Sequence, residues 1–184
     1  MYIQIYDNAL DKEECESIIK YFNTSPNTHR GSTITGNDQF LLDESNKSST
    51  DITLYYSNWE LPSQIFNPAL RKGLDKYVNK FPFLKEINPW NIDNGYNIQK
   101  YTEGEGYFSI HCEHNAPYNT NRLLAWMFYL NNARCGTRFY YPKKDIRAKR
   151  GRLVIWPAFW TYPHSGITPN KGEKYISTGW CIFD

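Results

Sequence analysis

The sequence predicts an α+β fold, with two helices near the N-terminus followed by a series of β-strands. The helical patterns occur before residue 81, whereas short runs of aromatic and β-branched residues, separated by turn signals, fill the chain from Gly95 onward. Aromatic residues make up 17% of the chain, a share typical of β-structure and of pocket walls. We expect one domain over residues 1–184, because this length can bury a sizeable core.

The N-terminal residues predict a strand and then a capped helix. Residues 2–6 alternate in the manner of a short strand. Asp11 and Glu14 have the spacing of a capping box, so a helix should begin there and run to about Phe22. Ile18 lies on the apolar face that this helix would turn to the core.

Residues 23–50 are rich in Ser, Thr, Asn and Gly, and predict a loop with a short extended piece at residues 40–42. A long loop inside a domain is often a lid or a binding loop, and a solvated insertion is the alternative. Pro62 then marks the start of a second helix, and the spacing of the apolar residues extends it to about Lys80.

Seven strands are expected after Gly95, with turn signals such as residues 104–106 and 170–172 between them. Their predicted ranges are 96–101, 107–113, 122–130, 137–141, 152–156, 162–164 and 175–183. A basic cluster at residues 143–152 precedes the fifth strand. We interpret this cluster as a solvated turn, with contact to an acidic partner as the alternative.

Two histidines and a glutamate stand out as a candidate metal site. On a strand, residues two apart point to the same face, so His111 and Glu113 converge while Cys112 faces away and His114 falls on the wrong side. His164 would have to return from a distant strand, as in a closed β-structure. Two histidines and one carboxylate leave half of an octahedral Fe(II) open for a co-substrate and O2.

Two other interpretations of these residues stay open at this point. A histidine beside aromatic residues is often a packed core residue rather than a ligand. Zinc is the competing metal, since His, Cys and Glu all bind it. The cysteines form no C-x-x-C pair, which argues against a structural zinc knuckle. They are Cys15, Cys112, Cys135 and Cys181.

Lys174 adds a second feature to the site. It follows His164 by ten positions and shares a strand face with Ile176, Thr178 and Trp180. A cation at this offset could hold the distal carboxylate of 2-oxoglutarate. The sequence therefore suggests a reaction as well as a fold.

The composition of the chain limits which binding partners and which cellular compartment we expect. The formal net charge of +2 is too small to indicate nucleic acid as the main partner. Residues 1–7 lack the basic and apolar segments of a signal peptide, and no apolar stretch is long enough to span a bilayer. Scattered cysteines fit a reducing compartment, so we expect the cytoplasm, or the host cytoplasm if the gene is carried by a phage.

Together these motifs resemble the Fe(II)/2-oxoglutarate-dependent dioxygenases, and specifically the prolyl 4-hydroxylase group. The resemblance covers roughly residues 96–180 and is greatest to the small single-domain members from bacteria and phages. It implies a double-stranded β-helix, or jelly roll, which carries its metal in the barrel mouth and is buttressed by N-terminal helices. The motifs that carry it lie at residues 96–107, 111–113, 122–131, 137–139, 151–157 and 164–180.

The resemblance also implies roles for individual residues. The metal ligands would be His111, Glu113 and His164. Lys174 would bind the C5 carboxylate of 2-oxoglutarate, assisted by the hydroxyl groups of Tyr101 and Thr137. The residues facing a peptide substrate would be Tyr107, Arg122 and Trp180. An aromatic wall that excludes water would consist of Tyr107, Phe108, Trp126 and Trp180.

Two departures from the family pattern occur. The usual carboxylate ligand is Asp, whereas this chain has Glu113, which is one methylene longer and still offers a single oxygen. The common Gly-Gly-x-Thr turn is reduced to Arg-Cys-Gly-Thr at residues 134–137, which bears on the role of Thr137.

The implied cofactor is Fe(II), with 2-oxoglutarate and O2 as co-substrates and ascorbate as a candidate reductant. The implied reaction hydroxylates a prolyl residue in a peptide or protein and releases succinate and CO2. An alternative keeps the chemistry but acts on a free amino acid, another side chain or a nucleobase. Nucleobase-repairing members generally use Arg in place of Lys174, which counts against that branch. A non-catalytic jelly-roll binding module is the remaining hypothesis.

Overall fold

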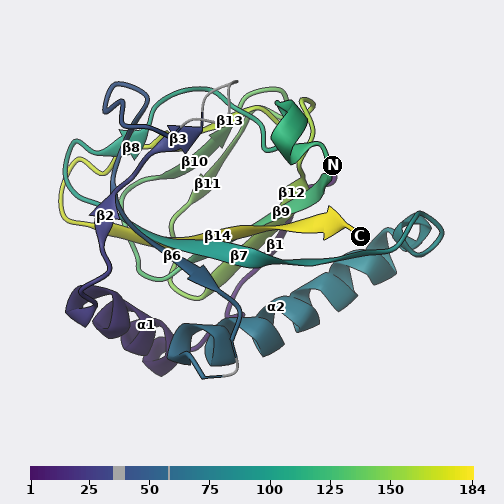
Figure 1. The fold of residues 1–184 in the computed structure, drawn as a ribbon, viewed down its shortest axis with the longest axis horizontal. Helices are drawn as coiled ribbons and strands as arrows, with labels where there is room; N and C mark the ends of the chain where they lie inside the picture. The colour runs from purple at the N-terminus through teal and green to yellow at the C-terminus, as the bar shows by residue number, and fades with distance from the viewer. Residues whose placement is uncertain (35–39, 58) are drawn as a thin grey trace.

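The computed structural model describes residues 1–34, 40–57 and 59–184. Two antiparallel sheets face each other, and two helices cover the outer face of the larger sheet (Figure 1). The α+β class predicted from the sequence is therefore confirmed, and the facing sheets fit a double-stranded β-helix. No helix in the described ranges is long and apolar enough to cross a membrane.

The larger sheet has seven strands in the order β1-β12-β9-β14-β7-β6-β2. Their bounds are Gln4–Tyr6 (β1), Arg152–Pro157 (β12), Arg122–Tyr129 (β9), Lys174–Phe183 (β14), Trp90–Tyr101 (β7), Thr50–Tyr55 (β6) and His29–Arg30 (β2). The smaller sheet has the order β11-β10-β13, with bounds Lys144–Arg147 (β11), Gly136–Phe139 (β10) and His164–Ile167 (β13). Two further pairs are β3 (Thr33–Ile34) with β4 (Phe40–Leu41), and β5 (Lys47–Ser48) with β8 (Gly106–Tyr107).

The helices begin where the sequence predicts. Helix α1 spans Lys12–Thr24, and Asp11 and Glu14 form the capping box, each side chain accepting from the other's backbone N–H at 2.8 Å. Helix α2 spans Leu61–Lys80 with Pro62 in its first turn. Two short 3-10 helices, η1 (Pro82–Lys85) and η2 (Pro117–Asn119), lie in connections.

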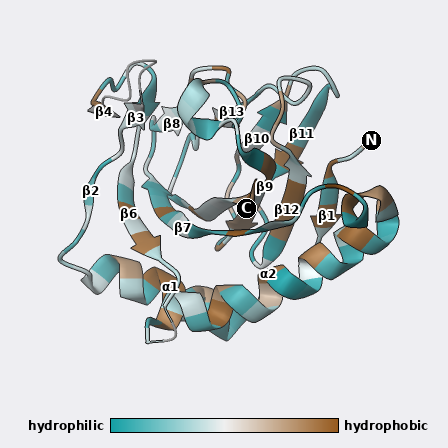
Figure 2. Cartoon of the chain, turned by 45° about the vertical axis from the view of Figure 1, so that its right-hand side comes forward, coloured by the Kyte–Doolittle hydropathy of each residue, from teal (hydrophilic) through white to brown (hydrophobic). Residues whose placement is uncertain are grey.

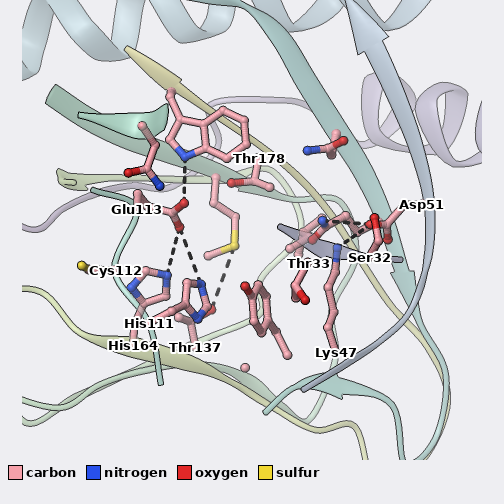
Figure 3. Close-up of a pocket in the computed structure, with 18 of the residues that line it drawn as sticks. Ser32, Thr33, Lys47, Asp51, His111, Cys112, Glu113, Thr137, His164 and Thr178 are labelled. Carbon is pink, nitrogen blue, oxygen red and sulfur yellow. Dashed lines mark hydrogen bonds and ion pairs between the residues drawn. The ribbon is translucent and has the colours of Figure 1, made fainter. Parts of the chain in front are cut away.

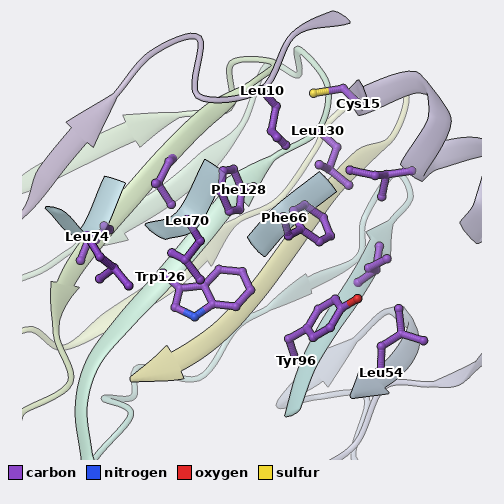
Figure 4. Close-up of a cluster of buried hydrophobic side chains, with 14 of the residues drawn as sticks. Leu10, Cys15, Leu54, Phe66, Leu70, Leu74, Tyr96, Trp126, Phe128 and Leu130 are labelled. Atoms are coloured by element: carbon purple, nitrogen blue, oxygen red, sulfur yellow. The ribbon is translucent and has the colours of Figure 1, made fainter. Parts of the chain in front are cut away.

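The helices pack on the sheet through one continuous apolar cluster (Figure 4). Phe66 and Leu70 of α2 are fully buried against Trp126 and Phe128 of β9, with 5.3 Å between the ring centroids of Phe66 and Phe128. The helix faces turned to the sheet are accordingly hydrophobic and the outer faces hydrophilic (Figure 2). This layer supports the sheet that carries much of the site.

Strand β9 is buried on both faces. Its alternate residues Ala125, Met127 and Tyr129 belong to a second cluster between the two sheets, whereas Trp126 and Phe128 face the helices. A strand buried on both sides has no polar face, and β9 is apolar throughout after Arg122. The interior between the sheets is where the polar site residues converge.

Several strands differ from the sequence-based prediction. Strand β6 lies in a region for which no strand is predicted, although buried Ile52 and Leu54 alternate with outward residues in the pattern of a strand. Strand β11 crosses the basic cluster, and β7 begins at Trp90 rather than at residue 96. Short strands also interrupt the predicted loop at 23–50, of which residues 35–39 lie outside the described part.

Candidate metal centre

The strand predicted at residues 107–113 is wrong beyond Tyr107. After this residue the chain changes backbone partners too often to form a ladder: Phe108 N–H donates to Asn46, His111 pairs with His164, and Glu113 N–H donates to Ala158. His111 and His164 form an isolated antiparallel bridge, with N–H to carbonyl distances of 3.0 and 2.8 Å. This bridge brings the two histidines side by side.

His111, Glu113 and His164 converge in the interior (Figure 3). Oε1 of Glu113 lies 3.3 Å from Nε2 of His164 and 3.8 Å from Nε2 of His111. The potential ligand atoms all lie within 4.8 Å of one another. Metal–ligand bonds of about 2.1 Å place neighbouring ligand atoms of an octahedron roughly 3 Å apart, so the three side chains fit one ion.

Backbone carbonyls orient both histidine rings. Nδ1 of His111 lies 2.9 Å from the Ser109 carbonyl, and Nδ1 of His164 lies 3.0 Å from the Tyr162 carbonyl. A proton on each Nδ1 satisfies these carbonyls and leaves each Nε2 lone pair free for a metal. Burial, followed by the nearby charge of His164, lowers the pKa of His111 to about 4.

Glu113 is held by groups on its other oxygen. The indole N–H of Trp180 donates to Oε2 at 2.8 Å, and the Arg122 guanidinium lies 3.7 Å from the same atom. The guanidinium also lies 3.6 Å from the centre of the Trp180 ring. Burial alone would raise the pKa of Glu113, but the side chains of His164, His111 and Arg122 around it lower this pKa well below its usual range. The carboxylate is therefore ionised, with Oε1 facing the histidines.

The neighbouring donors do not join this cluster. The His114 ring stacks on Phe159 with 4.8 Å between centroids. The Cys112 thiol donates to the His114 carbonyl at 3.3 Å and points away from the three ligands in Figure 3. The site therefore offers two nitrogens and one oxygen, a donor set suited to non-haem Fe(II).

Lys174 is a buried cation without a matching anion. It is 2% exposed, and no carboxylate in the described part of the chain forms an ion pair with it. Its ammonium makes only long contacts of 3.5 Å to the carbonyls of Gly136 and Ile167. Burial lowers the pKa of Lys174 to about 8. A buried ammonium of this kind is suited to bind an anionic ligand, which would supply the missing negative charge.

Tyr101 and Thr137 lie near Lys174 in different ways. The ammonium of Lys174 lies 4.4 Å from the centre of the Tyr101 ring, whereas the Tyr101 hydroxyl donates to Gln99 at 2.8 Å. The Thr137 hydroxyl accepts from Tyr129 at 2.7 Å. Tyr129 is thus a neighbour of the site that the sequence analysis did not identify. A Tyr in an apolar strand looks like an ordinary core residue, and no motif marks it.

One cavity is lined by all nine residues that the sequence assigns to the metal, to 2-oxoglutarate or to a peptide substrate. Tyr107 lies over the metal cluster, with 3.8 Å between its ring centroid and that of His111. The predicted aromatic wall needs two corrections. Trp126 faces the helices because it has the opposite parity to Met127 on β9, and Phe108 is 40% exposed outside the cavity. Trp156, which stacks edge-on against His164, contributes to the wall instead.

Other lining residues were not predicted. A polar group among them comes from β5, β6 and β7, and its members are Lys47, Asp51, Thr53, Asn97 and Gln99. Nothing in the local sequence distinguishes Lys47 from the surrounding Ser and Asn residues. The pairing of β6 with β7 brings Asp51, Thr53, Asn97 and Gln99 beside the cavity, and the pairing of β5 with β8 brings Lys47 there.

Comparisons with known proteins agree with this geometry. Residues 96–182 match the model of the 2OG-Fe(II) oxygenase superfamily. The comparison with curated proteins gave no significant match.

Solved structures that resemble the chain include three prolyl hydroxylases. A viral collagen prolyl hydroxylase from Paramecium Bursaria Chlorella virus-1, in a 2OG complex, is 18% identical with a TM-score of 0.70, covering 100% of this chain and 97% of that one. A Pseudomonas putida prolyl-4-hydroxylase is 14% identical with a TM-score of 0.70, covering 99% and 92%.

The third is a prolyl hydroxylase from Trichoplax adhaerens in complex with a hypoxia inducible factor oxygen degradation domain peptide fragment. It is 14% identical with a TM-score of 0.73, and the match covers 98% of this chain and 83% of that one. At such identities the likeness shows the fold. The match over residues 96–182, the segment that holds His111, Glu113 and His164, places this part of the chain in the 2OG-Fe(II) oxygenase superfamily.

Proposed function

We propose that this oxygenase hydroxylates a prolyl residue in a peptide or protein. His111, Glu113 and His164 would hold Fe(II), and Lys174 would bind the C5 carboxylate of 2-oxoglutarate. The observation that carries the proposal is the arrangement of the three potential ligands and the unpaired Lys174 in one cavity. When bound, Fe(II) with 2-oxoglutarate and O2 supplies an oxidation that hydroxylates a C–H bond and releases succinate and CO2.

The chain's own residues prepare this site in three ways. The carbonyls of Ser109 and Tyr162 fix the tautomers of the ligand histidines. Trp180 holds one oxygen of Glu113 and leaves the other to the metal. Lys174 neutralises an anion that would otherwise be costly to bury.

The choice of a prolyl substrate is supported by the aromatic residues beside the metal cluster. Tyr107 and Trp180 present flat faces in the cavity, and a proline ring packs well on such faces. Arg122, stacked on Trp180, adds donors at the cavity wall. The structural neighbours include a prolyl-4-hydroxylase and a prolyl hydroxylase solved with a peptide fragment, which supports the same class.

The alternative substrate is a free amino acid or another polar side chain. The polar wall formed by Asp51, Thr53, Asn97 and Gln99 favours this alternative, since a proline ring offers no partner to such groups. The four cysteines are free thiols, which supports a reducing compartment such as the cytoplasm for either substrate.

The test is to incubate the protein with Fe(II), 2-oxoglutarate, ascorbate and a panel of proline-containing peptides. We expect mass spectrometry to find one added oxygen on a prolyl residue, with matching succinate release. His111→Ala serves as the inactive control. If free amino acids stimulate succinate release and no prolyl peptide does, the hypothesis of a prolyl peptide substrate is wrong and the alternative substrate takes its place.

A further inference from the structure

A second buried lysine, Lys47, lines the same cavity. It is 5% exposed, and its ammonium donates to Asp51 at 2.5 Å. In Figure 3 this pair lies across the cavity from Glu113 and the two histidines. A buried ion pair is weak evidence for stability, because its desolvation offsets its attraction. Its position facing the cavity therefore calls for another explanation.

The backbone sets the distance between Lys47 and the metal cluster. Lys47 in β5 pairs with Tyr107 in β8, so its ammonium lies 5.8 Å from the centre of the Tyr107 ring. That ring stacks on His111 at 3.8 Å, which places the ammonium within about 10 Å of the His111 ring. A small ligand can therefore touch Lys47 with one end and approach the metal cluster with the other.

The acceptors around Lys47 are already occupied. Asp51 accepts from Lys47 and from Gln99 (3.3 Å) on one oxygen and from Ser49 (2.7 Å) on the other. Gln99 in turn accepts from the Tyr101 hydroxyl. An ammonium has three donors, and Asp51 is the one acceptor that Lys47 has within the described residues. The network therefore fixes Lys47 and leaves donors available.

Asn97 supplies further donors on the same wall. Its side-chain oxygen accepts from Thr53 at 2.8 Å, which orients the amide. The amide nitrogen donates to no acceptor in the described part of the chain, and Asn97 lines the cavity. Lys47 and Asn97 thus present N–H groups with few competing acceptors. Such a surface suits a ligand that is itself an acceptor.

The charges of the cavity lead to the same conclusion. Among the described lining residues, three cations (Lys47, Arg122 and Lys174) face two anions (Asp51 and Glu113). Fe(II) and the doubly negative 2-oxoglutarate cancel each other. The loaded cavity thus keeps one excess positive charge, which a substrate with one negative group would balance.

We propose that Lys47 and Asn97 form a subsite for a carboxylate group of the substrate. The inference rests on the proposed function and deepens it, since it specifies what lies beside the oxidised position. The carboxylate could come from an acidic side chain next to the target residue, from a C-terminal carboxylate, or from a free amino acid. These sources share one chemistry and are separated by experiment.

The test is a calorimetric titration of the anaerobic protein, loaded with Fe(II) and 2-oxoglutarate, with matched acid and amide ligands. The pairs are a peptide with Pro beside Glu or Gln, a peptide ending in Pro as the acid or the amide, and free L-proline or L-prolinamide. We expect the acid to bind at least about tenfold more tightly in one pair, and that pair identifies the source. Lys47→Met should abolish the preference, and Lys47→Arg should keep it.

Two further variants make the result interpretable. Lys47→Met leaves Asp51 buried without its cation, so the double variant Lys47→Met with Asp51→Asn removes both charges and keeps the shape. Lys100→Met is the matched control, because Lys100 is paired with Glu173 at 2.7 Å and lies outside the cavity lining. It should keep the wild-type preference for the acid.

The outcomes separate this inference from the proposed function. If no acid binds better than its amide, or if the double variant keeps the preference, the carboxylate subsite is refuted, even where prolyl hydroxylation is found. If only free L-proline shows a Lys47-dependent preference and no peptide is hydroxylated, the subsite stands and the peptide substrate fails.

Discussion

Replacing Lys174 with Met should stabilise the protein without ligands and weaken its binding of 2-oxoglutarate. Burial lowers the pKa of Lys174 from 10.5 to about 8. At about 1.4 kcal/mol per pKa unit, the buried charge costs the folded state up to about 3 kcal/mol below pH 8. Met has a similar shape and no charge, so Lys174→Met removes this cost.

The sign follows from proton linkage. Between pH 8 and 10.5 the unfolded state binds more protons at Lys174 than the folded state, so this contribution to stability rises with pH across that window. The gain in the variant should therefore be full at pH 7 and vanish above about pH 10.5. For a chain of this size, up to about 3 kcal/mol corresponds to a Tm increase of at most roughly 6–12 °C.

Addition of 2-oxoglutarate should narrow or remove this difference in stability. Losing a charged hydrogen bond of about 1.5–3 kcal/mol weakens 2-oxoglutarate binding roughly tenfold to 150-fold. The wild type should then gain more stability than the variant at the same ligand concentration. The affinity of the wild type for 2-oxoglutarate should also fall as the pH rises above about 8, because Lys174 loses its proton.

The assay is thermal unfolding of both proteins under anaerobic Fe(II), at pH 7 and pH 9, with and without 2-oxoglutarate. Lys100→Met is the control, since Lys100 is paired with Glu173 at 2.7 Å and lies outside the cavity lining. The proposed role of Lys174 in binding 2-oxoglutarate would be refuted by two results together. The variant would be less stable than the wild type without ligand, and it would keep the full Tm shift when 2-oxoglutarate is added.

Three further predictions concern the ligand carboxylate and the core. Trp180→Phe keeps a flat ring but removes the N–H that holds Glu113, so Fe(II) affinity should fall about tenfold to a hundredfold in an anaerobic titration; unchanged affinity would mean that the bond does not orient the ligand. Glu113→Asp should retain Fe(II) and part of the succinate release, because one carboxylate oxygen remains; complete loss of metal would contradict this. Phe66→Ala should lower the free energy of unfolding by roughly 3–5 kcal/mol in urea, because Phe66 is fully buried between α2 and β9; a loss below about 1 kcal/mol would show that the helix layer contributes little.

Local signals in the sequence were sufficient for the helices and for the metal cluster. The capping box at Asp11 and Pro62 in the first turn act within a few residues, so the starts of α1 and α2 are predictable. The predicted pairing of His111 with Glu113 assumes a strand that does not form there. The bridge between His111 and His164 brings the two histidines together instead, and Glu113 is held by a backbone hydrogen bond to Ala158.

The polar wall and the direction of Trp126 were beyond such local signals. Lys47 reaches the cavity because β5 pairs with β8, a contact between segments far apart in the chain. Trp126 faces the helices rather than the site because of its parity on β9, which depends on how β9 lies between β12 and β14. Both facts depend on strand register, which the sequence pattern does not specify where a strand is apolar on both faces.

The most direct test of the proposed metal site is a titration of Fe(II) into the anaerobic wild-type protein and into His164→Ala. We predict one equivalent of tightly bound Fe(II) in the wild type and none in the variant, with the circular dichroism spectrum unchanged. Binding of one equivalent with equal affinity by His164→Ala, with Cys112 or His114 serving as the substitute ligand, would contradict the proposed ligand set.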